Sequence, residues 1–129
     1  MVSIPAEYLD LLERPLIGHL ATVSPNGRPQ ANPMWFLWDG THLRFTHTNK
    51  RGKFRNLQRN PSMSLLLIND ENPQSYLEVR GELVEVIEDP DGDFYVRLGR
   101  RYGNPDTQPP PDKADRVVLV MSIEKANGR

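Results

Sequence analysis

The chain has 129 residues, no cysteine and a formal charge of −1 at pH 7. This length suits one domain over residues 1–129, and the lack of cysteine excludes disulfide bonds, thiolate metal ligands and a cysteine nucleophile. The N-terminus is acidic and amphipathic, unlike a secretory signal, and no apolar run reaches the roughly 18 residues of a membrane helix. A cytoplasmic protein without membrane segments is therefore expected.

The first forty residues are predicted to form a helix and a β-hairpin. Ser3 is suited to cap a helix that ends at Glu13, because apolar residues between them recur at helical spacing. Strands are predicted at 17–24 and 29–38 from their content of β-forming residues. Asn26-Gly27 lies between the two strands and favours a tight hairpin, because both residues tolerate positive φ.

The rest of the chain is predicted to alternate between strands and helices. In order, the elements are a strand at 42–48, a helix at 51–59 with Phe54 and Leu57 buried, strands at 62–69 and 75–88, a helix at 90–102, a proline-rich loop at 103–115 and a strand at 116–126. Within 75–88 the apolar residues change face around Gly81, which predicts a bulge or a bend. Six strands with short connections indicate a mainly β fold, an antiparallel closed or split β-barrel with three small helices.

Familiar catalytic and metal-binding patterns are missing. His42 and His47 are five residues apart on one predicted strand, so their side chains point to opposite faces and no metal site is predicted. The sequence contains no G-x-S-x-G motif, no P-loop and no G-x-G-x-x-G motif. Nothing in the chain indicates a hydrolase.

The segment TNKRGKFRNLQRNP (48–61) concentrates positive charge. Residues 40–69 contain six Lys/Arg and no Asp/Glu, which leaves this window at +6 and the rest of the chain at −7. Segregation on this scale favours a local anionic partner, although a basic, solvated helix face gives the same pattern.

The start of the helix predicted at 51–59 has the features of a phosphate site. Backbone N–H groups in the first turn of a helix have no partner within the helix and attract an anion. Gly52 leaves room for a phosphate oxygen near the backbone, and Arg51 and Lys53 can donate charge-assisted hydrogen bonds. We expect Lys53 to be solvent-accessible until a ligand binds.

A second candidate is the segment Asn32-Pro33-Met34-Trp35. Pro33 cannot donate a ladder hydrogen bond, which predicts a sheet edge or a break in pairing with free backbone groups nearby. Met34 and Trp35 offer apolar surface to a planar ring, although ordinary core packing explains them equally well.

Three segments carry a family resemblance: IGHLATVSPNGRPQANPMWFLWDG (17–40), FTHTNKRGKFRNLQRNP (45–61) and LEVRGELVEV (77–86). Together they resemble the split β-barrel flavin and deazaflavin reductases of the pyridoxamine-phosphate-oxidase-like superfamily. The resemblance implies a six-stranded antiparallel split barrel of the FMN-binding type, paired as a homodimer with cofactor sites at the subunit interface. It also implies cofactor contacts from Asn32, Pro33, Met34 and Trp35 along the ring, Thr46, His47 and Thr48 along the ribityl chain and phosphate, Arg51 and Lys53 at the phosphate, and Tyr76 from the partner subunit. Lys50 and Arg55 add positive charge that suits a longer anionic tail.

The expected cofactor is the deazaflavin coenzyme F420, with FMN as the alternative. Four cations at 50–55 suit the phosphodiester and glutamate tail of F420, whereas two cations and a helix end would satisfy the single phosphate of FMN. The chain ends at Arg129, directly after its last predicted strand, without the C-terminal arginine-bearing extension of true pyridoxamine phosphate oxidases, so that activity is not expected.

The resemblance implies an oxidoreductase that transfers a hydride between the ring C5 and a quinone, enone or tetrapyrrole acceptor. Water or His47 would supply any proton that the acceptor needs. A cofactor carrier without activity and a barrel that binds single-stranded nucleic acid are the alternatives. Nucleic acid is disfavoured, because the positive charge is confined to one segment and the acidic remainder would repel a long polyanion.

Overall fold

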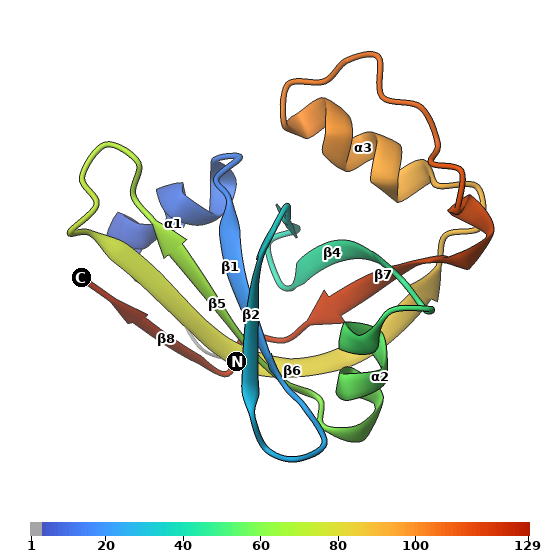
Figure 1. Ribbon diagram of the computed structural model, residues 1–129. Coiled ribbons are helices and arrows are strands. Elements are labelled where there is room, and N and C mark those ends of the chain that lie inside the picture. The colour runs from blue at the N-terminus through green and yellow to red at the C-terminus, as the bar shows by residue number, and fades with distance from the viewer. Residues whose placement is uncertain (1–3) are drawn as a thin grey trace.

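The computed structural model describes residues 4–129, so the predicted cap Ser3 lies outside the described residues (Figure 1). The elements are α1 (Ala6–Glu13), β1 (Gly18–Val23), β2 (Pro29–Met34), β3 (Leu37–Trp38), β4 (Leu43–Thr48), α2 (Gly52–Arg59), β5 (Ser62–Ile68), β6 (Tyr76–Glu88), α3 (Asp93–Arg101), the 3-10 helix η1 (Lys113–Asp115), β7 (Arg116–Met121) and β8 (Lys125–Gly128). None of the helices in the described part of the chain is long and apolar enough to cross a membrane.

The strands form one curled antiparallel sheet in the order β2-β1-β5-β6-β7-β4-β3. Strand β8 lies off this path and pairs with the first half of β6. The long strand β6 joins the two halves, because it pairs with β5 and β8 near its start and with β7 near its end (Figure 1). The predicted mainly β split barrel is confirmed. The hydrogen-bond path ends at β2 on one side and at β3 on the other, which leaves both as edge strands.

The structure has eight strands in its described part, so the prediction of six is wrong. The predicted strand 29–38 is interrupted at Trp35 and Phe36, because the Phe36 side chain is fully buried and its backbone N–H donates to the Tyr102 hydroxyl (3.1 Å). The predicted strand 116–126 is interrupted after Met121, where the chain bends around β6.

The β1–β2 hairpin forms as predicted, but for a different reason. Among residues 4–129 only glycines have positive φ, and in this turn it is Gly27 (φ 83°) and not Asn26. The Gly27 N–H donates to the Ser24 carbonyl (2.9 Å), and the Ser24 N–H donates to the Arg28 carbonyl (2.9 Å). These bonds describe a three-residue loop with a left-handed glycine and not a two-residue Asn-Gly turn.

The predicted irregularity in β6 is present, but it begins two residues after Gly81. A Cβ at Gly81 would lie 1.8 Å from the Ser122 carbonyl oxygen, so β6 and the end of β7 approach more closely than a side chain allows. The register of β6 against β7 shifts between Leu83 and Glu85. This shift lies where β6 passes from its pairing with β5 to its pairing with β7.

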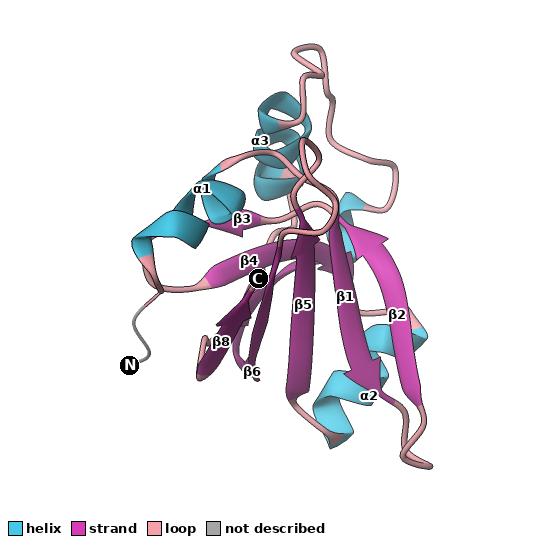
Figure 2. Cartoon of the chain, turned by 90° about the vertical axis from the view of Figure 1, so that its left-hand side faces the viewer, coloured by secondary structure: helices cyan, strands magenta, loops and turns pink. Residues whose placement is uncertain are grey.

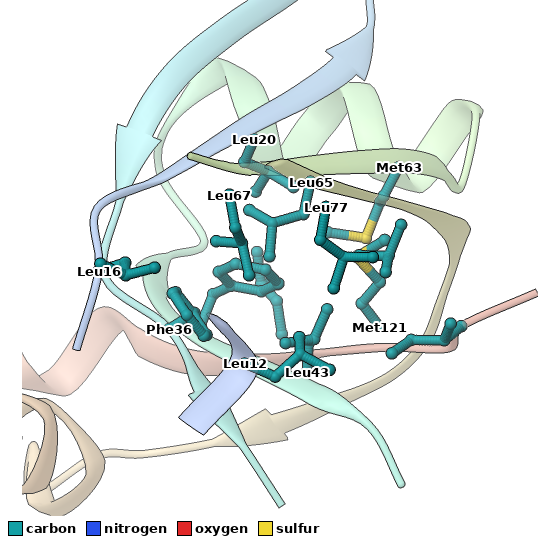
Figure 3. Packing of buried hydrophobic residues seen from close by; sticks show 14 of the residues in the cluster. Leu12, Leu16, Leu20, Phe36, Leu43, Met63, Leu65, Leu67, Leu77 and Met121 are labelled. Carbon is teal, nitrogen blue, oxygen red and sulfur yellow. The ribbon is translucent and has the colours of Figure 1, made fainter. Parts of the chain in front are cut away.

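The hydrophobic core fills the space enclosed by the curled sheet (Figure 3). Leu20, Leu65 and Leu77 come from neighbouring strands and are fully buried, which contributes about 1.5–3 kcal/mol for each side chain. Helices α1 and α2 lie towards opposite ends of the barrel (Figure 2). Leu57 of α2 is buried as predicted, whereas Phe54 is only half-buried. On β4 the inward positions are Leu43, Phe45 and then His47, which puts the imidazole at the end of the core.

Candidate cofactor site

A cavity of about 780 Å³ lies where β2, the end of β4, the start of α2 and the start of β7 meet. None of the carboxylates in residues 4–129 lines it. The lining residues are Gln30, Ala31, Asn32, Pro33, Met34, Thr46, His47, Arg51, Gly52, Lys53 and Arg116.

Three cations line this cavity. Arg51 and Lys53 flank the start of α2, and Arg116 is the first residue of β7. The expectation that Lys53 is solvent-accessible is wrong, because only 9% of the residue is exposed. Burial and the neighbouring charge of Arg51 lower the pKa of Lys53. A bound anion would favour the charged form of Lys53 and so offset both effects, which means that the cavity favours negative charge.

Arg116 was not predicted from the sequence. It lies more than fifty residues beyond the end of the basic segment, and no local pattern sets it apart from the other arginines. The pairing of β4 with β7 brings it here, because Arg116 is opposite Thr48 in the register. A prediction of the strand order would have been needed to find it.

Two buried polar atoms in the cavity wall have no hydrogen-bond partner. They are Thr46 Oγ1 and His47 Nε2, and only 6% of His47 is exposed. Burial, followed by the charges of Lys53, Arg51 and Arg116, lowers the pKa of His47 from 6.5 to about 4. His47 is therefore neutral at pH 7. It can donate a hydrogen bond there, but it does not carry the second proton that it would have to transfer to an acceptor.

The first turn of α2 is open toward a ligand. The N-cap residue Arg51 makes no side-chain cap hydrogen bond, and the first turn of the helix contains no acidic residue. A Cβ built on Gly52 has no atom within 4 Å, so a methyl group there would project into open space. Free N–H groups, a glycine and two cations at a helix start fit the phosphate of a cofactor.

An apolar recess of about 340 Å³ adjoins the cavity and shares Pro33, Met34 and Thr46 with it. Ile17 and Trp35 complete its wall. The Trp35 ring stacks on Tyr102, with centroids 4.7 Å apart and an interplanar angle of 8°. This contact fixes the indole in place, so the recess offers a rigid surface of the kind a flat ring system needs.

Residues 4–129 match the family model described as pyridoxamine 5′-phosphate oxidase. The chain belongs to this family. A solved structure named F420 reductase is 53% identical and covers 96% of this chain and 98% of its own, with a TM-score of 0.93. A conserved hypothetical protein from Mycobacterium tuberculosis is 28% identical over 99% of this chain and 85% of its own, with a TM-score of 0.72.

General stress protein 26 from Bacillus anthracis shares the fold at 19% identity, with a TM-score of 0.70 over 95% of this chain and 90% of its own. No curated protein matches the chain. The family match and the 53% identical structure support an oxidoreductase function.

Most residues that the family resemblance implied lie together in this structure. The cavity and its recess contain Asn32, Pro33, Met34, Trp35, Thr46, His47, Arg51 and Lys53. Thr48 is buried outside the cavity wall, and Lys50 and Arg55 are exposed outside it. Tyr76 lines a separate recess with Leu66 and Ile68. These four residues are not among those that line the cavity.

His47 makes the stability of this protein dependent on pH. Its pKa of about 4 in the folded state lies below the ordinary 6.5, so between these values the unfolded state binds more protons. The free energy of unfolding should be highest above pH 6.5 and should fall, by up to about 3 kcal/mol from this group, as the pH drops through that window.

Urea unfolding at pH 4.5 and pH 7 checks this, with His47→Gln compared against wild type. Both proteins have the same carboxylates. The difference between their changes in the free energy of unfolding from pH 7 to pH 4.5 therefore reports the imidazole alone. His19→Gln removes an exposed imidazole on β1 and serves as the matched control. An equal change in the free energy of unfolding between the two pH values in wild type and His47→Gln would contradict the prediction.

Proposed function

We propose that this protein is an oxidoreductase that binds coenzyme F420 and transfers a hydride between it and a small organic acceptor. One observation carries the proposal: a cationic cavity and an apolar recess share one wall. Arg51, Lys53 and Arg116 surround the first, and Trp35 borders the second. A cofactor with an anionic tail and a flat head needs both environments, side by side.

The residues of the chain act by binding and orienting. Arg51 and Lys53 would hold the phosphate together with the free N–H groups of α2, and neutral His47 would add a hydrogen bond through Nε2. Trp35, held by Tyr102, would fix the plane of the ring and exclude water from one face. When bound, the deazaflavin ring supplies the hydride chemistry. Acceptors of the quinone, enone or tetrapyrrole class suit an apolar recess.

The choice of F420 over FMN is supported by similarity more than by charge. Lys50 and Arg55, expected to hold an extended tail, lie outside the cavity. The three cations that line it suit a phosphate monoester and a phosphodiester alike. The 53% identical structure is named F420 reductase, and this favours the deazaflavin.

The proposal includes a homodimer with the site at the subunit interface. The residues Gln30–Pro33 of the edge strand β2 are exposed, so one wall of the cavity faces outward. Tyr76 lines a different recess of its own chain and would reach a cofactor only from a second copy. A sedimentation experiment that finds only monomers, with or without cofactor, would contradict this part.

Fluorescence titration of the purified protein with F420 and with FMN tests the proposed cofactor. We expect tight, stoichiometric binding of F420 and weaker binding of FMN, followed by oxidation of reduced F420 when a quinone, an enone or a biliverdin-like tetrapyrrole is added. A yellow protein that retains FMN would indicate the flavin enzyme instead. Binding of F420 without turnover on any acceptor would indicate a carrier, and salt-sensitive binding of single-stranded DNA without either cofactor would overturn the proposal.

A further inference from the structure

Arg116 is held from two sides by residues that do not line the cavity. Its Nε donates to Asp112 Oδ1 (3.2 Å), and its guanidinium carbon lies 4.8 Å from the centre of the Tyr95 ring. Tyr95 belongs to α3, and Asp112 lies in the loop before η1. Only 11% of the Arg116 side chain is exposed.

This arrangement leaves the far edge of the guanidinium free. Within residues 4–129 the structure shows no hydrogen bond or ion pair from Nη1 or Nη2 of Arg116. A planar guanidinium that is fixed at Nε and stacked on one face can present its two Nη atoms to a phosphate as a fork. An arginine that is already ordered loses less side-chain freedom when the anion binds.

We propose that Asp112 and Tyr95 are positioning residues that orient Arg116 toward the phosphate of the ligand. They connect α3 and the loop 103–115 to the affinity of a cavity that neither residue touches. The identity of the ligand rests on the proposed function, whereas the anion chemistry rests on Arg116, Arg51 and Lys53 themselves.

Substitutions at Tyr95 test the stacking contact without a change of charge. Tyr95→Leu should raise the Kd for F420 about threefold to tenfold, whereas Tyr95→Phe keeps the ring face and should bind like wild type. Arg116→Gln should by itself weaken F420 binding about 10-fold to 100-fold. Adding Tyr95→Leu to Arg116→Gln should then cause no further loss of affinity. Equal losses in both backgrounds would show a merely structural role and would overturn the proposal.

Asp112→Asn gives a second test in which two effects have opposite signs. Removing a negative charge near a cationic cavity should tighten anion binding through long-range electrostatics. An amide oxygen accepts a weaker hydrogen bond from Nε than a carboxylate does, so Arg116 should be held less firmly and anion binding should weaken. We expect a Kd about threefold higher than wild type, again only when Arg116 is present. Asp106→Asn removes an exposed acid from the same loop and is the matched control. Tighter binding by Asp112→Asn would overturn the role of Asp112.

A parallel measurement with inorganic pyrophosphate separates this inference from the proposed function. Pyrophosphate should raise the melting temperature of wild type above that in NaCl of equal ionic strength, and Tyr95→Leu and Arg116→Gln should each reduce the increase. If wild type bound neither F420 nor FMN but showed this pattern, the positioning role would stand and the proposed function would fall. If pyrophosphate stabilised all variants equally, the positioning role would be wrong.

Discussion

Lys53→Glu is expected to weaken F420 binding by about 100-fold or more while the protein stays folded. Lys53 lines the cavity, so the change removes a charge-assisted hydrogen bond, which contributes about 1.5–3 kcal/mol, and adds repulsion between two anions. Burial and the like charge of Arg51 now lower the pKa of Lys53. The fold should tolerate the change, because the same Arg51 charge would attract a carboxylate at this position. Fluorescence titration gives the Kd, and thermal unfolding reports the fold.

Arg55→Glu is the matched control for this experiment. It makes the same change of charge on the same helix, but Arg55 is exposed and lies outside the cavity. We expect a loss of affinity of less than about tenfold, through screened long-range repulsion alone. Similar losses in both variants would mean that α2 acts by its general charge, and unchanged affinity in Lys53→Glu would separate the cofactor from this helix.

Gly81→Ala is expected to lower the free energy of unfolding by about 3–5 kcal/mol, which is among the larger effects of a single substitution. The added Cβ would lie 1.8 Å from the Ser122 carbonyl oxygen, a backbone atom that cannot rotate away. Relief of this contact would also disturb the hydrogen bonds between Ser122 and Glu82, at 2.9 and 3.0 Å, where β6 passes β7. Urea unfolding measures the change.

Gly52→Ala is the contrasting glycine substitution. Space is open around its Cβ, and the residue begins a helix, so stability should be unchanged or raised by up to about 1 kcal/mol. Because Gly52 lines the cavity, its methyl group would instead take up space there and weaken F420 binding. Gly81→Ala should thus affect stability and Gly52→Ala affinity. A Gly81→Ala protein within about 1 kcal/mol of wild type would show that β6 and β7 can separate without cost.

Several features of the fold were predictable from local pattern alone. Pro33 lies on the edge strand β2, as expected for a residue without an N–H to donate. The helix after Lys50 and the strands on either side of it begin and end within two residues of their predicted bounds. Such features depend on contacts between near neighbours in the chain, and residue type and spacing determine these contacts.

The same reasoning failed where distant segments meet. The basic helix predicts an accessible Lys53, yet the residue is buried in the wall of a cavity that β2, β4 and β7 also line. The strand 29–38 was predicted to be continuous, because its composition does not reveal that Phe36 turns inward and that its N–H is bonded by Tyr102, sixty-six residues away. The sequence offers His47 as a proton donor, and only its burial, followed by the charges of the three cations packed around it, shows that it is neutral at pH 7.

By itself the sequence determined the alternation of strands and helices, the cluster of positive charge, and the two segments that carry phosphate-binding and ring-binding chemistry. The tertiary structure alone decided which cations share one cavity, because strand pairing brings Arg116 beside Thr48 and leaves Lys50 and Arg55 outside. The burial of Lys53 and His47, their lowered pKa values and the unpartnered His47 Nε2 follow from that packing. They arise from the distances between residues far apart in the chain, which periodicity and composition do not encode.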